Sequence, residues 1–428
     1  MNLKIQYKSP SEALSIIHSG NRIFIQGSAQ TPTYLINYLA RESYRLENVE
    51  LVFISIYGDL EVTKPEYRSH FDINTLFVSN SIRNDVANGY ADYIPVFLSE
   101  IPELFKRQIL PIDVAIVQVS IPDKHGYCSL GVSVDIARSA VNTAKKVIAQ
   151  VNPNVPRTHG DGLIHTSRFT SMVYCEDLLH EANFSESITE NDLKIGKFIA
   201  ELVEDRSTLQ MGIGSIPDAV LQCLTSHKDL GVHTEMCSDG IINLFEKDVI
   251  NNKYKNIHPN KAVTGFALGT KKLYDYVDDN PAFAFLDIDY VNDPHVIRRN
   301  NKMVAINSAI EVDITGQICS DSIGTKQFSG VGGQMDFIRG ASLSEGGKPI
   351  IALSSRTAKG LPKIVSLLKP GAGVVTTRAH AHYIITEYGI AYLYGKNLRQ
   401  RAKELIKIAH PDDREKLEKD CYERFKIF

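Results

Sequence analysis

The sequence of 428 residues predicts an α/β fold made of two tandem, duplicated open domains with mostly parallel sheets. Strand and helix candidates alternate along the chain, which is typical of parallel sheets with helical crossovers. A turn of one pattern also occurs twice, once in each half. The length suits two to three domains of about 100–200 residues each. A hydrophobic content of 43% is enough to build their packed cores.

Short apolar runs rich in β-branched residues are the strand candidates. In chain order they are Arg22–Ile25, Val49–Ile56, Val114–Val119, Lys146–Val151, Ala262–Phe266, Phe283–Asp287, Ile350–Ala352 and Gly373–Thr376. Runs with apolar residues at helical spacing predict helices between them. The clearest of these are Pro10–His18, Thr33–Arg41 and Asp192–Glu204.

The two halves share a pattern of helix end, polar turn, strand, and a glycine followed five positions later by a proline. The first copy reads IIHSGNRIFIQGSAQTPTYLINYL from Ile16, and the second reads LVEDRSTLQMGIGSIPDAVLQCL from Leu202. Pro32 and Pro217 are each expected to open a helix, because proline is favoured at the first helical position. Duplication of one α/β domain explains this repeat.

The strand after each of these helices holds Ser55 in the first half and Glu235 in the second. We place an N-terminal domain at residues 1–187 and a C-terminal domain at residues 188–428. The boundary is set there because the segment 183–191, NFSESITEN, is polar and poor in helix formers.

Charge and cysteine usage disfavour several classes of protein. The net charge of −3 argues against a duplex nucleic-acid binder but leaves room for a small anionic ligand. The six cysteines form no C-x-x-C pair, and isolated cysteines suit a reducing compartment. The N-terminus shows no apolar signal region, and no apolar run reaches the roughly 18 residues of a membrane span. We therefore expect a cytoplasmic protein with no membrane or nucleic-acid partner.

Two glycine-rich segments are candidates for ligand contact. QMGIGSIPDAV (210–220) places a Gly-Ile-Gly turn before a helix, where backbone N–H groups suit phosphate or a developing oxyanion. It is not a Walker A loop, and a plain strand-to-helix turn is the alternative. FSGVGGQMDFIRGA (328–341) has three glycines in four positions, which favours a loop that faces a ligand. Its Asp336 and Arg339 are expected to be structural.

Glu235 lies in LGVHTEMCSDGIINL (230–244), and it could be a solvated surface acid, a metal ligand or a nucleophile. It lies one helix and one strand after the Gly-Ile-Gly turn. In an α/β fold both therefore reach the carboxyl edge of adjacent strands, where open sheets bind ligands. Cys237 is a rival nucleophile, but no catalytic-cysteine signature surrounds it, and buried inert cysteine is the common case.

The histidines suggest other roles less strongly. His125 lies in SIPDKHGYCSLGVSVD (120–135), where no spaced acid marks it as a base, so a structural or gating loop is expected. Two histidine pairs match neither a zinc-protease nor a deaminase spacing, and we expect no metal site. The pairs are His159 with His165 and His380 with His382.

Four motifs in this order resemble the acetyl-CoA hydrolase/transferase family, which are class I coenzyme A transferases. They are GIGSIP, HTEM-x-SDG, GVGGQMDF and TEYGIAYLYGKNLRQRAKELIKIAHPDDRE. SIPDKHGYCSLGVSVD and INSAIEVDITGQI fit the same pattern, although SIPD stands where such loops often read SPPD. The resemblance runs from about Gly20 to near the C-terminus. It is nearest to the 4-hydroxybutyrate and butyrate:acetate CoA-transferase branch.

The resemblance implies an enzyme with a glutamate nucleophile and the class I CoA-transferase fold. Glu235 aligns with the family's catalytic glutamate, which forms a glutamyl-CoA thioester in ping-pong turnover. CoA would be a substrate, no cofactor would be bound permanently, and the second domain would hold most of the CoA. The implied contacts are Gly212, Ile213, Gly214, Ser215, Ile216, Asn307, Gly332 and Gly333. The loop Gln26–Pro32 would close over the acyl group, and such enzymes usually form homodimers.

The implied reaction moves CoA from acetyl-CoA, 4-hydroxybutyryl-CoA or butyryl-CoA to a free short-chain carboxylate such as acetate. A glutamate is ordinarily ionised near neutral pH, so the attack needs no general base. Each tetrahedral intermediate needs a donor for its oxyanion instead. Two alternatives stay open: an acyl-CoA hydrolase that uses the same site, and a CoA-binding sensor that uses the fold without turnover.

Overall fold

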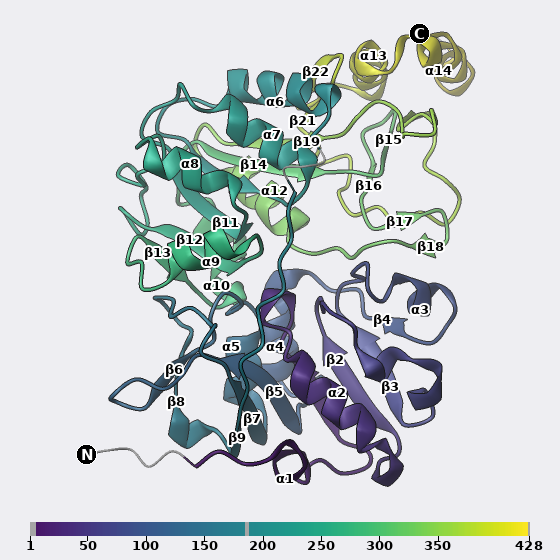
Figure 1. Cartoon of the computed structure of the whole chain (residues 1–428). Coiled ribbons are helices and arrows are strands. Elements are labelled where there is room, and N and C mark those ends of the chain that lie inside the picture. Colours follow the sequence, from purple (N-terminus) through teal and green to yellow (C-terminus); the bar gives the residue numbers. More distant parts are fainter. Residues whose placement is uncertain (1–5, 185–187, 427–428) are drawn as a thin grey trace. The chain divides into compact units, whose positions relative to one another are not determined.

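The computed structural model describes residues 6–184 and 188–426 (Figure 1). The chain divides into two compact units. The first combines the chain up to Ala182 with the segment Val263–Val291, and the second combines Asn183–Ala262 with Asn292–Phe428. The expected boundary at 187/188 falls beside residues 185–187, outside the described residues, and stays a prediction.

A seven-stranded parallel sheet forms the first unit, in the order β4-β3-β2-β1-β5-β7-β9. Its strands are β1 (Arg22–Ile25), β2 (Val49–Phe53), β3 (Phe71–Thr75), β4 (Asp92–Tyr93), β5 (Val114–Val119), β7 (Lys146–Val151) and β9 (Ser171–Tyr174). β5 reads VAIVQV and is buried at every position, as expected for a parallel strand covered on both faces. A separate antiparallel pair joins β6 (Tyr127–Ser129) to β8 (Leu163–His165).

Helices lie between the strands of the first unit along the chain, and some contribute side chains to its hydrophobic core. They are α1 (Pro10–Leu14), α2 (Thr33–Arg41), α3 (Arg83–Ala87), α4 (Ile101–Lys106), α5 (Ala137–Thr143), α9 (Lys271–Val277) and α10 (Ile288–Val291), with the short strands β12 (Ala262–Ala267) and β13 (Phe283–Phe285) before α9 and α10. α2 buries Leu35, Ile36, Leu39 and Ala40, which share one helical face. This face packs with strand residues such as Ile23 in one hydrophobic cluster.

The second unit repeats the same strand order. Its parallel strands run β11-β10-β14-β19-β21, and β22 pairs antiparallel with β21. Their bounds are β10 (Thr208–Met211), β11 (Gly231–Cys237), β14 (Met303–Ser308), β19 (Lys348–Ala352), β21 (Tyr383–Thr386) and β22 (Gly389–Tyr392). This order matches β2-β1-β5-β7-β9 strand for strand. The expectation of two duplicated α/β domains with mostly parallel sheets is therefore confirmed.

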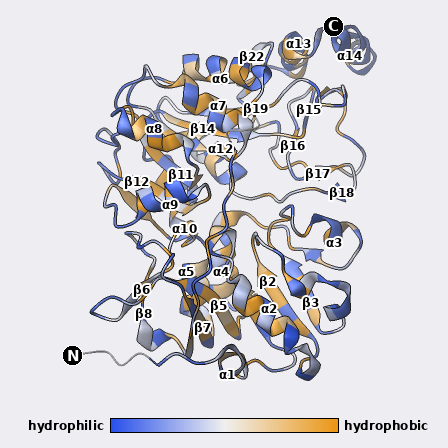
Figure 2. Cartoon of the chain, in the orientation of Figure 1, coloured by the Kyte–Doolittle hydropathy of each residue, from blue (hydrophilic) through white to orange (hydrophobic). Residues whose placement is uncertain are grey.

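Helices and short strands fill the rest of the second unit. The helices are α6 (Glu190–Leu202), α7 (Ser215–Cys223), α8 (Gly240–Glu246), α11 (Pro294–Ile297), α12 (Gln334–Leu343), α13 (Leu398–Ile408) and α14 (Pro411–Phe425). The short strands are β15 (Glu311–Asp313), β16 (Ile318–Cys319), β17 (Ser322–Ile323), β18 (Lys326–Gln327) and β20 (Ile364–Val365). A capping box between Thr189 and Asp192 starts α6. α14 buries only Leu417 and Cys421, and it is mostly hydrophilic in Figure 2.

Four expected elements have the bounds that the structure shows, namely Arg22–Ile25, Val114–Val119, Lys146–Val151 and Thr33–Arg41. Two expectations are wrong. Gly373–Thr376 is no strand, because only Thr376 pairs, in an isolated bridge with Ile318. Pro217 does not open its helix, because α7 begins at Ser215, directly after a glycine in a left-handed conformation. Among the residues described, no helix has the length and apolar character that a bilayer crossing requires.

Candidate active site

Three neighbouring parallel strands of the second unit end at one edge, and most of the expected site residues lie there. β10 pairs with both β11 and β14, so that Met211 stands opposite Ile306. Thr234 Oγ1 accepts from the Met211 N–H at 3.2 Å and donates to the Met211 carbonyl oxygen at 3.1 Å. Glu235 and the turn after Met211 therefore lie together at the carboxyl edge, where open α/β sheets bind ligands.

Glu235 is held by the amide of a buried asparagine. The glutamate is half-buried on β11, and Asn292 Nδ2 donates a hydrogen bond to its Oε2 at 3.1 Å. Asn292 itself is 0% exposed, so its side chain has little freedom to turn away. A hydrogen bond to an ionised acceptor is stronger than one between neutral groups. The orientation of the carboxylate is therefore fixed by the protein itself.

Gly333 borders the same carboxylate. Any residue can adopt its φ of −97°, so the backbone conformation does not require glycine at this position. The requirement comes from the lack of space for a side chain. A Cβ built on Gly333 would overlap both Glu235 Oε2 and Asn292 Nδ2. The preceding Gly332 has a φ of 57°, which favours glycine for conformational reasons. The loop that carries these two glycines therefore lies directly against Glu235.

Asp336 is the second carboxylate at this position. It lies in the first turn of α12 and is 5% exposed. Asn292 Nδ2 donates to Asp336 Oδ2 at 3.3 Å, so a single amide group bonds Glu235 and Asp336 together. The carbonyl oxygen of Asn292, Oδ1, is buried and has no hydrogen-bond partner among the residues that the structure describes.

The Gly-Ile-Gly turn connects β10 to α7. The N–H of Gly212 donates to the Ile306 carbonyl oxygen at 3.3 Å, which continues the ladder between β10 and β14 by one residue. Gly214 has a φ of 119°, a backbone conformation that favours glycine. A Cβ built on Gly214 would meet no described atom within 4 Å, so the turn borders open space. Ile213 is 42% exposed at the tip, and Ser215 and Ile216 form the first turn of α7.

Polar contacts fix the base of this turn. Asp218 on α7 accepts a hydrogen bond from Ser238 Oγ at 2.9 Å, which ties α7 to the residues after β11. Burial raises the pKa of Asp218, and the nearby charge of Asp239 adds to that shift, whereas the Ser238 bond opposes it. Asn307, near the end of β14, donates from Nδ2 to Gln210 Oε1 at 3.0 Å. Asn307 is therefore held beside β10.

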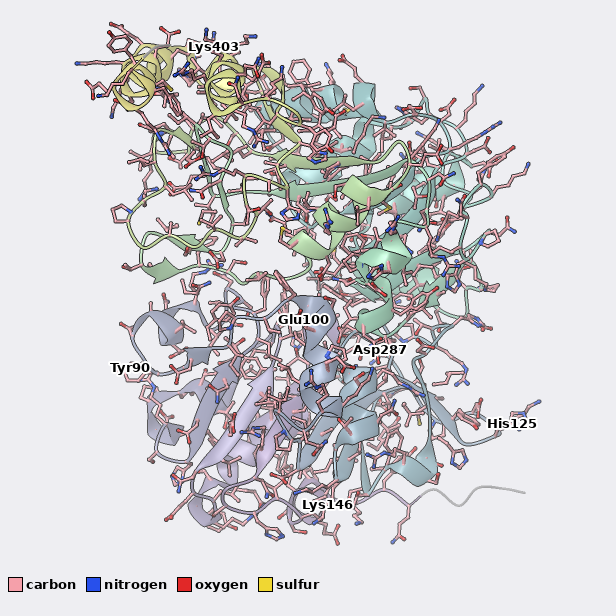
Figure 3. The ribbon with its side chains drawn as sticks, turned by 180° about the vertical axis from the view of Figure 1, so that it is seen from behind. Tyr90, Glu100, His125, Lys146, Asp287 and Lys403 are labelled. Carbon is pink, nitrogen blue, oxygen red and sulfur yellow. The ribbon has the colours of Figure 1, made fainter. Side chains whose placement is uncertain are left out.

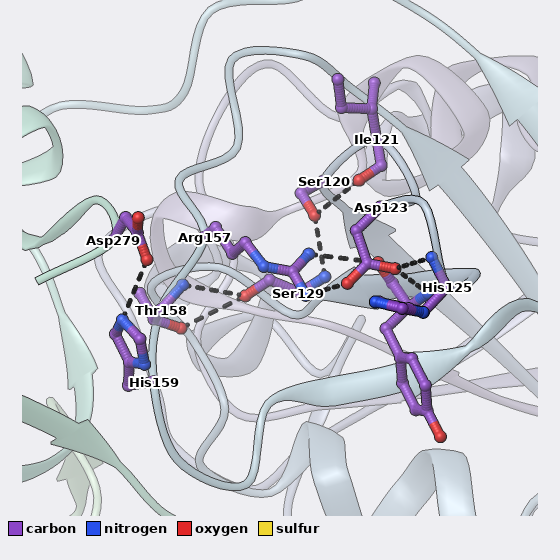
Figure 4. Close-up of polar contacts among 10 residues, drawn as sticks. Ser120, Ile121, Asp123, His125, Ser129, Arg157, Thr158, His159 and Asp279 are labelled. Atoms are coloured by element: carbon purple, nitrogen blue, oxygen red, sulfur yellow. Dashed lines mark hydrogen bonds and ion pairs between the residues drawn. The ribbon is translucent and has the colours of Figure 1, made fainter. Parts of the chain in front are cut away.

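The other candidate residues have surroundings that differ from those of Glu235. Cys237 is 3% exposed. His125 lies at the outer end of the loop before β6 (Figure 3). Asp123 Oδ1 accepts from the N–H groups of His125 and Tyr127, each at 2.9 Å. Arg157 Nη2 donates to Asp123 Oδ2 at 2.7 Å, and Figure 4 shows Asp123 between Arg157 and His125. These contacts give the loop a structural role, in which the imidazole of His125 is not needed.

The histidine pairs bond to neighbours of their own. His159 Nε2 pairs with Asp279 Oδ1 at 3.0 Å (Figure 4). His165 Nδ1 pairs with Ser167 Oγ at 2.8 Å. Burial, with the charges of His380 and Arg401, lowers the pKa of His382 to about 4. Within residues 6–184 and 188–426, no three His, Cys, Asp or Glu side chains gather in an arrangement that could hold a metal ion.

Sequence reasoning missed Asn292 and assigned Asp336 a structural role. Asn292 lies in the short stretch VNDP between two short helices, where a single asparagine is typical of a turn. Only the packing of this segment against β11 and α12 reveals its contact with Glu235. No local spacing signal could have identified it.

Comparison with known proteins identifies the family of this chain. Residues 2–200 match the acetyl-CoA hydrolase/transferase N-terminal domain, and residues 269–421 match the C-terminal domain of the same family. The chain is 51% identical over 421 residues to the succinyl-CoA:acetate/propanoyl-CoA:succinate CoA transferase of Fasciola hepatica, covering 97% of this chain and 87% of that protein. It is 48% identical over 415 residues to the 4-hydroxybutyrate coenzyme A transferase of Clostridium kluyveri, covering 97% and 96%.

The fold agrees as well. The crystal structure of a 4-hydroxybutyrate CoA-transferase from Porphyromonas gingivalis superposes with a TM-score of 0.85 at 38% identity, covering 98% of both chains. The fold and the CoA-transferase class expected from the sequence are thereby confirmed. This chain belongs to the acetyl-CoA hydrolase/transferase family.

Proposed function

We propose that this enzyme transfers CoA between a short-chain acyl-CoA and a free carboxylate through a glutamyl-CoA thioester on Glu235. Acetyl-CoA, 4-hydroxybutyryl-CoA and butyryl-CoA are the proposed donors, and acetate is the proposed acceptor. The names of the relatives support acetate and 4-hydroxybutyrate and add succinyl-CoA and propanoyl-CoA to the donors worth testing.

The observation that carries the proposal is the setting of Glu235. Its carboxylate lies at the carboxyl edge of β11, bonded to a fully buried amide, against a glycine that has no room for a side chain. A solvated surface acid needs none of these features. A nucleophile needs all three, because its oxygen must be oriented and a reacting carbonyl must approach it closely.

The reaction proceeds in balanced steps. A Glu235 carboxylate oxygen attacks the acyl-CoA carbonyl carbon, and the C–S bond breaks to give a mixed anhydride and CoA thiolate. The thiolate attacks the Glu235 carbonyl carbon of the anhydride, which forms the glutamyl thioester and releases the first acid as a carboxylate. A second carboxylate then enters, and the same two steps run in reverse. No proton is transferred, so the site needs oxyanion donors rather than a general base.

Each expected contact has a role in this scheme. Gly212–Ile216 would contact CoA with backbone N–H groups beside the open space at Gly214. Asn307 would bond an amide of the pantetheine arm, and Gly332 with Gly333 would bring backbone to the reacting carbonyl. Binding energy from the long CoA arm would position the thioester at Glu235.

A hydrolase is the second candidate, because the family description covers both reactions. Both would use Glu235, and they differ in whether water reaches the anhydride and the thioester. A transferase gives acetyl-CoA from acyl-CoA and acetate without net thiol release. A hydrolase releases free CoA when no acceptor acid is present.

Borohydride trapping tests the mechanism directly. The protein is incubated with acetyl-CoA, freed of unbound ligand, reduced with borohydride and mapped by mass spectrometry. Reduction of Glu235 to the alcohol, which an excess of acetate should prevent, is the expected result. Turnover with an unmodified Glu235 would overturn the proposal. Glu235→Gln is the negative control, and Cys237→Ser tests the rival nucleophile.

We further propose a homodimer in a reducing, cytoplasmic compartment. The family resemblance supports the dimer, and six free cysteines, five of them buried, support the compartment. Light scattering of the purified chain tests the first statement, and cell fractionation tests the second.

A further inference from the structure

We propose that Asp336 is a positioning residue for the reaction, because it orients the Asn292 amide toward Glu235. This inference rests on the proposed role of Glu235 as the nucleophile. Sequence reasoning treated Asp336 as a structural residue of α12, and the contacts around Asn292 give it a second role.

The Asn292 amide has only one orientation that fits its surroundings. Its Nδ2 has two hydrogens, and two carboxylate oxygens lie within hydrogen-bond distance, Glu235 Oε2 at 3.1 Å and Asp336 Oδ2 at 3.3 Å. Turning the amide over would place Oδ1 against both carboxylates, where every group is an acceptor. Oδ1 has no partner where it now lies, so its own contacts contribute nothing to the choice. The two carboxylates alone decide which atom faces Glu235.

Glu235 cannot supply this control through a full reaction cycle. As a carboxylate it attracts an N–H donor strongly, but as an anhydride or thioester it is neutral, and its hydrogen bond weakens. Asp336 takes no part in the bond changes and keeps its acceptor oxygen throughout. The amide therefore keeps Nδ2 toward the Glu235 carbonyl oxygen, where it can donate when negative charge develops there.

The fold holds Asp336 firmly enough for this role. Asp336 lies in the first turn of α12, and the next turn brings Gly340 against Ile297 of α11. A Cβ on Gly340 would overlap the Ile297 side chain, so this contact between the two helices requires glycine. α11 begins two residues after Asn292. Asp336 and Asn292 are thus placed by one tight helix contact, and both are nearly or fully buried.

A double-mutant cycle tests whether Asp336 acts through Asn292. The variants are Asp336→Asn, Asn292→Ala and the two combined, each assayed for kcat, for KM of acyl-CoA, and for the single-turnover rate of Glu235 thioester formation. We expect Asp336→Asn to lower kcat about 10- to 100-fold, the scale of one hydrogen bond to a charged group. KM should change little. In the Asn292→Ala background the same substitution should have no further effect on kcat.

Two results would overturn the proposal. One is a kcat for Asp336→Asn equal to that of the wild type. The other is a combined loss equal to the product of the two single losses, which would mean that Asp336 acts independently of Asn292. Asp336→Ala repeats the cycle if Asp336→Asn fails to fold, and thermal unfolding of each variant identifies such a failure.

Asp313→Asn is the matched control. Asp313 is 1% exposed in the same unit, and it accepts from Thr315 and Gln317 in the turn after β15. We expect this variant to lower the melting temperature and to leave kcat unchanged. Failure of the underlying function is separately visible, because borohydride would then leave Glu235 unmodified in the wild type. Failure of the Asp336 proposal alone would leave that label intact and its rate unchanged in Asp336→Asn.

Discussion

The turns after β1 and β10 hold the same place in the repeated topology, and they differ in what borders them. In the first unit Ser28 N–H donates to the Ser55 carbonyl oxygen at 2.6 Å, and a Cβ on Gly27 would overlap that same oxygen. In the second unit a Cβ on Gly214 would meet no atom within 4 Å, and Ile213 is 42% exposed. The turn after β1 is thus packed against residues of its own unit, whereas the turn after β10 borders open space.

The polar groups near the two turns also differ, because only the second unit adds a carboxylate to neutral amides. In the first unit Gln26 accepts from the Gln118 N–H at 2.7 Å, and Gln150 donates to Gln118 at 2.7 Å, so neutral amides bond one another in the interior. The second unit has a neutral amide pair as well, Asn307 with Gln210, and adds the carboxylate of Glu235 on β11, with Asn292 as its partner. A neutral network can be satisfied internally, whereas a charge demands partners and is retained where it has a function. Under the proposed function, the chemistry of the duplicated fold lies in the copy that carries this carboxylate.

Replacing Glu235 by glutamine should have the largest effect. We expect kcat to fall by about 10⁴-fold or more, the scale for loss of a nucleophile, because the amide cannot form the anhydride. Ser55→Ala, the counterpart in the first unit, should stay within severalfold of the wild type. Steady-state rates of CoA transfer measure both. Similar losses in the two variants would break the proposed division of roles.

Substituting alanine for Gly333 and for Gly27 should separate activity from stability. In Gly333→Ala the new methyl group displaces the ends of two side chains, Glu235 and Asn292, so kcat should fall about 100-fold as the nucleophile is misplaced. In Gly27→Ala it overlaps backbone, so the free energy of unfolding should fall by about 1–3 kcal/mol. Parallel assays and thermal melts compare them. An intact kcat in Gly333→Ala would contradict the placement of Glu235.

A smaller effect is expected for Gly214→Ala. The added methyl group has open space, but a φ of 119° disfavours alanine by about 1–3 kcal/mol. The turn should relax, and KM for acyl-CoA should rise while kcat changes less. Initial rates over a range of acyl-CoA concentrations test this. An unchanged KM would mean that the open turn does not contact CoA.

The smallest effect is a change in pH dependence. Lys255 Nζ donates to the carbonyl oxygens of Val232 on β11 and of Lys261, each at 2.7 Å, and burial lowers its pKa from 10.5 to about 7. Between these values the unfolded chain binds a proton that the native chain does not, so the free energy of unfolding rises with pH. Urea unfolding at pH 7, 8 and 9 should show this rise in the wild type and a weaker one in Lys255→Met.

Lys253→Met is the control for that experiment, since Lys253 is exposed two residues away. Its slope with pH should equal that of the wild type. Equal slopes in all three proteins would mean that Lys255 does not titrate in this range. The strand that carries Glu235 would then have no buried amine of lowered pKa beside it to distinguish it from β2.

Much of the fold could be predicted from local sequence. Arg22–Ile25, Val114–Val119 and Lys146–Val151 are parallel strands whose apolar runs end in polar residues, and that pattern needs no tertiary information. Gly373–Thr376 has a similar composition but finds no neighbouring strand along its length, so the same pattern failed there. A strand requires a partner, and composition alone does not supply one.

The candidate site can likewise be divided into features that local sequence predicts and features that depend on tertiary packing. The sequence by itself determined the repeat, the two glycine loops, Glu235 as the candidate nucleophile and the family, because each depends on residues close together in the chain. Only the tertiary structure decided that Gly333 borders Glu235, that Asn292 bonds it, and that Asp336 shares the amide. These residues lie 57 and 44 positions apart, from Glu235 to Asn292 and from Asn292 to Asp336. Packing of α11 against α12 brings them together, and no local pattern records that contact.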